Sequence, residues 1–125
     1  MKIAVTAGIL ERGGRVLIAR RKPGRHMAGR WEFPGGKIEA GESPEQSLAR
    51  ELAEELDLRV QVGPLLCRAD WSGDGMSLEL MVYRVESFEG TPVLREHEEI
   101  RWVLPGELRG FELADSDRKV VETLF

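Results

Sequence analysis

The chain has 125 residues, 42% of them hydrophobic, and carries a formal net charge of −4. This length suits one domain, residues 1–125, that can bury a core, and the composition is typical of a globular protein. The negative charge argues against general binding of a nucleic-acid polymer through a basic surface.

The first ten residues, MKIAVTAGIL, lack the longer apolar core and the small-residue cleavage site of a signal peptide and are typical of a β-strand. No apolar stretch approaches the roughly 20 residues that span a bilayer, so we expect no membrane association. Cys67 is the only cysteine, so no internal disulfide can form. We therefore expect a cytoplasmic, reducing compartment.

The first half of the chain is predicted to contain two strands and one helix. Residues 3–10 and 15–20 read as strands joined by a turn at Gly13 and Gly14. A loop then leads to residues 31–33 and to a Pro-Gly-Gly turn at residues 34–36.

A well-specified helix follows this turn. Ser43 is a good N-cap, and Gln46, three residues later, completes a capping box. Leu48, Leu52 and Leu56 repeat every four residues, which predicts an apolar stripe packed on the core.

The second half is predicted to contain three strands and a C-terminal helix. The elements are, in chain order, strands at residues 58–68, 77–85 and 100–104, a helical turn at 105–108 and a helix at 116–124. A turn at residues 72–75 separates the first two strands. In the last helix, Val120, Val121 and Leu124 are expected to face inward.

Three acids of the central helix, Glu51, Glu54 and Glu55, are spaced i, i+3 and i+4, which places them on one helical face. Like charges this close repel by up to about 4 kcal/mol per pair in a partly screened environment. Hard divalent cations such as Mg²⁺ take oxygen ligands of this kind. The alternative is an ordinary amphipathic surface helix that is rich in glutamate.

The residues around these acids decide between the two interpretations. They match the pattern G-x5-E-x7-R-E-U-x-E-E-x-G-U, where U is bulky and apolar, at Gly36, Glu42, Arg50, Glu51, Leu52, Glu54, Glu55 and Leu58. This pattern is the Nudix box, and the chain resembles the Nudix hydrolase family. One position departs from it, because Asp57 stands where the pattern has the glycine that ends the helix. Asp tolerates the left-handed conformation expected there.

The resemblance continues outside the box. Residues 19–46 are similar to MutT-type nucleoside triphosphate pyrophosphohydrolases, and residues 96–108 and 113–124 to the CTP pyrophosphohydrolase branch. The resemblance implies an α/β fold, an α/β/α sandwich around a mixed, curved sheet. It also implies Mg²⁺-dependent hydrolysis, with Mn²⁺ as a possible substitute. The implied substrates are 8-oxo-dGTP or cytidine-type (d)NTPs, cleaved to nucleoside monophosphate and pyrophosphate.

The resemblance further implies roles for the acids. Glu54 and Glu55 are expected to bind the metal directly, and Glu51 to bind it or to orient and deprotonate the attacking water. The carbonyl of Gly35 is expected to be a further metal ligand. Arg50 is expected to orient Glu51 through a charge-assisted hydrogen bond.

A further acid outside the box is expected to approach the metal. We assign it to Glu96, with Glu98 as the next candidate, because the run REHEE is similar to such a loop in both related branches. The alternative is that Glu96, Glu98 and Glu99 form a solvated loop.

Nucleotide contacts are assigned by the same resemblance. Arg21 and Lys37 are candidates for the phosphates, and His26 matches a histidine of MutT-type chains. Asp117, with Asp115 as the fallback, aligns with the residue that reads the edge of the base; a helix N-terminal acid that favours the dipole is the structural alternative. Phe33 could pack against the base, as could Trp71.

Three alternatives to a (d)NTP pyrophosphohydrolase are considered. One is a Nudix enzyme for ADP-ribose or dinucleoside polyphosphates, although the proline that is usual after the box in ADP-ribose enzymes is replaced by the run WSGDG. Another is a catalytically silent Nudix-fold binding module, although all box glutamates are present. The third is an acidic cation-binding protein without turnover. The expected partner is a small nucleotide, and the chain is expected to be a monomer or a homodimer.

Overall fold

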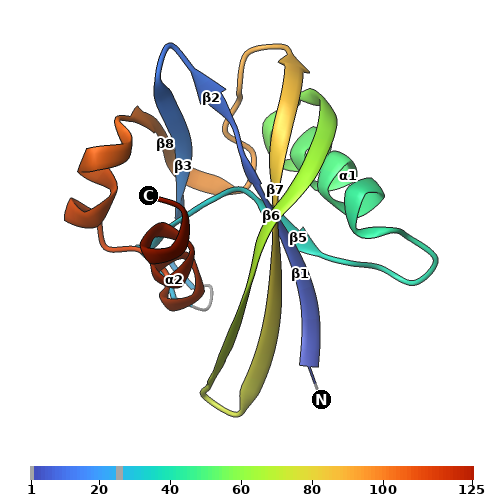
Figure 1. The fold of residues 1–125 in the computed structure, drawn as a ribbon, viewed down its shortest axis with the longest axis vertical. Helices are drawn as coiled ribbons and strands as arrows, with labels where there is room; N and C mark the ends of the chain where they lie inside the picture. Colours follow the sequence, from blue (N-terminus) through green and yellow to red (C-terminus); the bar gives the residue numbers. More distant parts are fainter. Residues whose placement is uncertain (1, 25–26) are drawn as a thin grey trace.

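The computed structural model describes residues 2–24 and 27–125, whose strands form two sheets (Figure 1). The first sheet is four-stranded, in the order β5 (Gly35–Lys37), β1 (Lys2–Ile9), β7 (Met76–Glu89) and β6 (Arg59–Gly73). β1 and β7 are parallel, whereas the β1–β5 and β6–β7 pairs are antiparallel. The sheet is therefore mixed, as predicted.

The second sheet is built around β3 (Arg15–Arg21). This strand pairs antiparallel with β2 (Glu11–Arg12), with β4 (Trp31–Glu32) and with β8 (His97–Val103). The two sheets therefore share no strand. Residues from both sheets line the same cavity.

The helices are α1 (Pro44–Leu56), a 3₁₀ helix η1 (Pro105–Gly110) and α2 (Asp115–Leu124). Figure 1 shows α1 and α2 on opposite sides of the strands, and both contact β6. The predicted α/β architecture with a mixed sheet between helices is confirmed.

The caps of α1 explain why the helix begins and ends where predicted. Ser43 Oγ accepts a hydrogen bond from the Gln46 N–H at 3.1 Å, and Gln46 Oε1 accepts one from the Ser43 N–H at 2.9 Å. At the other end, Asp57 takes the left-handed conformation, with φ 58° and ψ 35°, and its N–H donates to the Ala53 carbonyl. Asp therefore replaces the box glycine without a change in the cap.

The core consists of two apolar clusters, one for each helix. Leu48, Leu52 and Leu56 of α1 are fully buried in one cluster, as their spacing predicted. Val120 and Val121 of α2 are buried in the other, with Leu124 half-buried against it. Each helix is thus held by its apolar face, which leaves its polar face to carry other groups.

The predicted boundaries were wrong at the long hairpin. β6 and β7 pair as far as Gly73 and Met76, so the turn is shorter than residues 72–75. The polar run at the tip shows no apolar alternation, but backbone pairing does not require it. β8 also begins earlier than residue 100, at His97, because its backbone pairs with Arg21 of β3.

The predicted turn at residues 34–36 also contains a strand. Gly35–Lys37 forms β5, which pairs with β1 through Val5, Thr6 and Ala7. The residue types there indicated a turn, and only the neighbouring strand makes the segment extended. Among the described residues, no helix is long and apolar enough to cross a membrane.

Candidate active site

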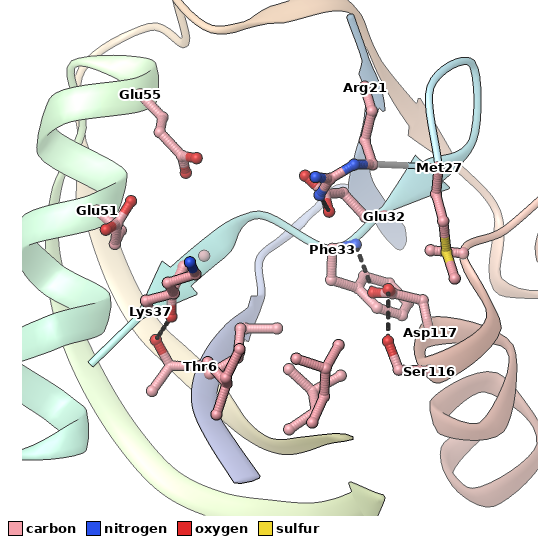
Figure 2. A pocket seen from close by; sticks show the side chains of 18 of the residues that line it. Thr6, Arg21, Met27, Glu32, Phe33, Lys37, Glu51, Glu55, Ser116 and Asp117 are labelled. Atoms are coloured by element: carbon pink, nitrogen blue, oxygen red, sulfur yellow. Dashed lines mark hydrogen bonds and ion pairs between the residues drawn. The ribbon is translucent and has the colours of Figure 1, made fainter. Parts of the chain in front are cut away.

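A cavity of about 600 Å³ opens between α1 and α2 (Figure 2). Its walls come from β1, β3, β4, β5, α1, β7 and α2, together with Glu96 and His97 at the start of β8. In Figure 2, Glu51 and Glu55 project from α1 on one side, and Ser116 and Asp117 lie at α2 on the other. The cavity therefore has an acidic end at α1 and a second polar end at α2.

The helical spacing brings two of the three predicted acids to the cavity. Glu51 and Glu55, one turn apart, both line it, and Glu55 is buried with 7% of its surface exposed. Glu96 lines it from outside the helix. Glu54 does not line the cavity; its side chain is 57% exposed and accepts a hydrogen bond from Arg50 at 3.2 Å. A spacing of three residues rotates Glu54 away from Glu51 by about 60°.

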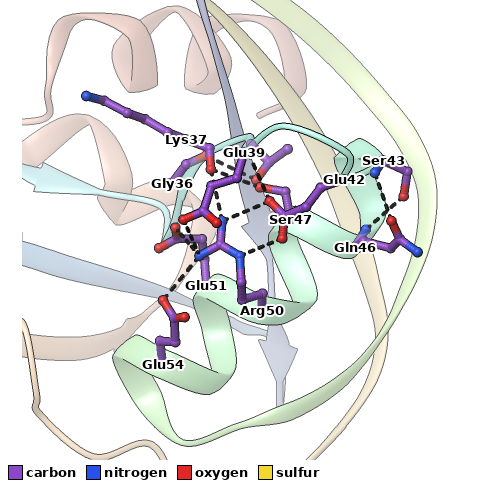
Figure 3. Close-up of polar contacts among 11 residues, drawn as sticks. Gly36, Lys37, Glu39, Glu42, Ser43, Gln46, Ser47, Arg50, Glu51 and Glu54 are labelled. Carbon is purple, nitrogen blue, oxygen red and sulfur yellow. Dashed lines mark hydrogen bonds and ion pairs between the residues drawn. The ribbon is translucent and has the colours of Figure 1, made fainter.

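Arg50 is the centre of the polar network on α1 (Figure 3). Its Nε and Nη2 donate to the two Glu42 oxygens at 2.6 and 3.0 Å, and Nη1 donates to Glu51 Oε1 at 2.9 Å. Nη2 also reaches the Lys37 carbonyl at 3.1 Å. The bond to Glu42 raises the pKa of Arg50 and lowers the pKa of Glu42. Arg50 thus makes the contact with Glu51 that its predicted orienting role requires.

The acidic end of the cavity disfavours several negative charges at once. Burial, together with the negative charges of Glu32, Glu51 and Glu96, raises the pKa of Glu55 to about 9. Burial also raises the pKa of Glu51. Glu55 Oε2 is buried without a hydrogen-bond partner. A cation would satisfy this oxygen and neutralise its neighbours, so the donor set fits a hard divalent ion.

Among the described residues, no three His, Cys, Asp or Glu side chains are grouped so that they could hold a metal ion by themselves. Mg²⁺ does not need such a cage, because it is usually bound by one or two carboxylates together with waters and substrate phosphates. The open acidic wall formed by Glu51, Glu55 and Glu96 matches that mode of binding.

Two glycines let β5 pass between β1 and the acids of α1. A Cβ on Gly35 would lie 2.0 Å from the Thr6 carbonyl oxygen, and a Cβ on Gly36 would lie 2.4 Å from Glu51 Cδ. The Thr6 hydroxyl donates to the Gly36 carbonyl at 3.4 Å. Only glycine therefore lets the backbone approach the Glu51 carboxylate this closely.

A partly buried polar network that the sequence did not predict joins three strands at the cavity. Glu32 Oε1 accepts from Arg21 Nη1 at 2.6 Å, and Glu32 Oε2 accepts from His97 Nε2 at 2.8 Å. His97 is only 5% exposed. Arg21, predicted to contact phosphate, is therefore held by Glu32 at the cavity wall. The only sequence signal for His97 was its place within the acidic run REHEE.

At the α2 end, Asp117 is 5% exposed, and its Oδ1 accepts from the Phe33 N–H at 2.9 Å. Burial, together with the negative charge of Glu32, raises the pKa of Asp117 to about 8. Both residues, which the sequence assigned to base contacts, line the cavity. The Phe33 ring, however, packs in the core and stacks on Phe125 at 6.3 Å between ring centroids.

The other candidates are placed as follows. Lys37 lines the cavity with an exposed side chain, whereas His26 lies outside the described residues. Glu98 lies in β8 and pairs with Arg20 at 3.4 Å, so it belongs to a strand and not to a solvated loop. Two further candidates for base contacts, Asp115 and Trp71, do not line the cavity.

Comparison with known proteins agrees with this arrangement. The NUDIX domain model matches residues 1–124, and the chain therefore belongs to the Nudix family of hydrolases. Enzymes of this family use divalent metal ions and act on nucleotide substrates.

Two relatives and one solved structure are close to the chain over nearly its whole length. It is 38% identical over 120 residues to the CTP pyrophosphohydrolase of Escherichia coli K12, covering 96% of this chain and 89% of that protein. It is 32% identical over 124 residues to the 8-oxo-dGTP diphosphatase of the same organism, covering 98% and 96%. The crystal structure of a MutT NUDIX hydrolase from Burkholderia pseudomallei matches with a TM-score of 0.91 and 28% identity, covering 100% of this chain and 99% of that one.

Proposed function

We propose that this enzyme hydrolyses a nucleoside triphosphate to nucleoside monophosphate and pyrophosphate with Mg²⁺, for which Mn²⁺ can substitute. The observation that carries the proposal is one cavity with a buried, unpartnered Glu55 oxygen at one end and the buried Asp117 at the other. The names of the two Escherichia coli relatives narrow the substrate to 8-oxo-dGTP or a cytidine-type (d)NTP.

The phosphates belong at the acidic end. Glu55 and Glu96 would hold the metal together with the Gly35 carbonyl, and Glu51 would hold it or take a proton from the attacking water. The family resemblance adds Glu54 as a ligand, and Glu54 would have to leave its bond with Arg50 and turn towards the cavity to reach the ion. When bound, the ion neutralises phosphate charge and helps to place that water. The Arg50 bond to Oε1 fixes the plane of the Glu51 carboxylate, which leaves Oε2 to accept the proton.

Cations at the cavity wall complete the phosphate end. Arg21, oriented by Glu32, and the exposed Lys37 both line the cavity and supply positive charge for the phosphate oxygens. A small nucleotide that neutralises these groups fits the site, whereas the net negative charge of the chain disfavours a nucleic-acid polymer.

The base belongs at the α2 end. Asp117 Oδ1 accepts from the Phe33 N–H at 2.9 Å, whereas Oδ2 accepts only a long bond from the Ser116 hydroxyl at 3.5 Å. Oδ2 is therefore the oxygen that meets the base edge. As a carboxylate it accepts from an exocyclic amino group, and in the neutral form that burial favours it can donate to a carbonyl. Apolar side chains of β1 and β7, among them Val5 and Leu80, provide a surface for the ring.

Product analysis with Mg²⁺ tests the proposal. The substrates are CTP, dCTP, 5-methyl-dCTP, dGTP and 8-oxo-dGTP, with ADP-ribose and a dinucleoside tetraphosphate as comparisons. We expect monophosphate and pyrophosphate from one triphosphate far faster than from the others. Turnover of ADP-ribose or the dinucleotide alone, or release of orthophosphate in place of pyrophosphate, would reject the proposed reaction.

A cytoplasmic location, consistent with the single cysteine, completes the proposal.

A further inference from the structure

The segment that carries Glu96 is attached to the end of α1. Arg95 Nη1 donates to the carbonyls of Ala53 at 3.3 Å and Glu54 at 3.5 Å, in the last turn of that helix. Its Nη2 lies 3.4 Å from Asp57 Oδ1, at the helix C-cap. Two residues earlier in the same segment, the Val93 N–H donates to the Leu56 carbonyl at 3.0 Å.

Arg95 places a positive charge at the C-terminal end of α1, where the helix itself has none. The last turn contains no basic residue and carries Glu54 and Glu55, which face the negative end of the helix dipole. A cation at a helix C-terminus is stabilising, and here it comes from a distant part of the chain. The position of Arg95 is therefore set by charge as well as by hydrogen bonds.

On the other side of Glu96, the chain is attached to the second sheet. His97 Nε2 donates to the Glu32 carboxylate at 2.8 Å, and the backbone at His97 pairs with Arg21 of β3. The Arg95 carbonyl also accepts from Lys22 Nζ at 3.2 Å. The two neighbours of Glu96 are thus bound to different elements, Arg95 to α1 and His97 to β4.

Glu96 itself lines the cavity together with Glu51 and Glu55 of α1. Without attachment on both sides, a carboxylate on an exposed segment would lose entropy each time it bound an ion. The bonds of Arg95 and His97 remove part of that cost in advance.

We propose that Arg95 is a positioning residue that, together with His97, holds the Glu96 carboxylate across the cavity from Glu51 and Glu55. The inference rests on the proposed function, because it treats Glu96 as a metal-binding group. Groups that orient a metal ligand commonly contribute tenfold or more to metal affinity.

The direct test measures Mn²⁺ affinity, because it needs no turnover. The full chain is titrated with Mn²⁺, and free ion is followed by electron paramagnetic resonance. We expect Arg95→Ala to weaken Mn²⁺ binding by about tenfold, and Arg95→Lys to restore part of the loss, because an ammonium can still reach the helix carbonyls. Arg59→Ala is the matched control, because Arg59 is exposed on β6 and pairs with Glu89 outside the cavity.

A second readout separates positioning from general stability. If Arg95 positions Glu96, the Mg²⁺ concentration for half-maximal turnover rises in Arg95→Ala, and kcat recovers at saturating Mg²⁺. A lower melting temperature with unchanged Mn²⁺ affinity would show a purely structural role and overturn the inference.

Glu96→Gln distinguishes failure of this inference from failure of the proposed function. Weaker Mn²⁺ binding in Glu96→Gln but not in Arg95→Ala overturns the positioning role alone. Unchanged Mn²⁺ affinity in Glu96→Gln would show that Glu96 is not a metal ligand and would overturn the inference. The proposed reaction would still stand or fall by the product analysis alone.

Discussion

Glu55 is an acid whose charge the protein fold alone does not stabilise. Burial and three neighbouring carboxylates raise its pKa to about 9, and one of its oxygens has no hydrogen-bond partner. Such a group is destabilising unless a ligand compensates for it. The metal ion that we propose for the cavity would supply this compensation.

Replacing Glu55 tests this explanation. We expect Glu55→Gln to reduce turnover at least about hundredfold, because a metal ligand is lost. The fold is kept, because the amide, like the neutral acid that burial favours, carries no charge. Glu54→Gln is expected to reduce turnover as well, through the ligand role that the family resemblance implies. Initial rates and circular dichroism measure both effects, and full activity in both variants would contradict the site assignment.

Asp117 gives a prediction about pH. Its pKa is about 8 in the folded chain against an ordinary value of 3.8, so folding favours its neutral form. The stability from Asp117 is therefore complete below about pH 4 and is lost as the pH rises towards 8, by up to about 1.4 kcal/mol per pH unit.

We expect Asp117→Asn to remove this part of the pH dependence, because the amide cannot ionise and its oxygen can still accept from the Phe33 N–H. Urea unfolding of the metal-free protein between pH 5 and 8 measures the effect. Asp115→Asn is the control, because Asp115 is partly exposed and pairs with Arg30 at 3.6 Å. Parallel curves for Asp117→Asn and the unmodified chain would reject the prediction.

At the scale of elements, α1 connects stability with the site, because its apolar stripe is buried while Glu51 and Glu55 face the cavity. The capping box fixes where the helix begins and hence which side chains face each way. We expect Ser43→Ala to lower the free energy of unfolding by about 1 kcal/mol, whereas Ser43→Asp, which keeps an acceptor, should lose much less. Denaturant melts compare the variants, and equal losses in both would count against the cap.

The elements also show how far residue spacing in the sequence predicts which side chains reach the site. The i, i+3, i+4 pattern predicted one acidic face, but Glu54 is rotated out of the cavity and bonded to Arg50. Spacing defines angles around a helix axis, and only the neighbouring β5 and β8 determine where the wall of the cavity lies. The strands β4 and β5 were missed for a related reason, because their extended form depends on pairing with β3 and β1.

At the scale of the whole molecule, residues from both sheets and from α1 and α2 line the cavity. We therefore expect an ion bound there to stabilise the complete fold. At ten times its dissociation constant, a bound ion adds about 1.4 kcal/mol to the free energy of unfolding. We expect a rise in melting temperature when MgCl₂ replaces NaCl at equal ionic strength, and a smaller rise in Glu55→Gln. The same rise in both proteins would place the ion elsewhere.

The sequence by itself determined the parts of this protein that depend on local chemistry. The helix caps, the leucine stripe, the left-handed Asp57 and the acidic box were all readable, because each depends on residues within a few positions of one another.

Only the tertiary structure decided which groups meet. Glu32, His97 and Arg21 are far apart in the chain, as are Arg95 and the end of α1, and strand pairing and helix packing bring them together. Hydrogen bonds of this kind depend on distances of a few ångströms between distant segments, which no local residue pattern encodes. The acids that line the cavity and the local contact of Arg50 with Glu51 were therefore predictable. The contacts that Arg21, Arg95 and His97 make with distant segments were not.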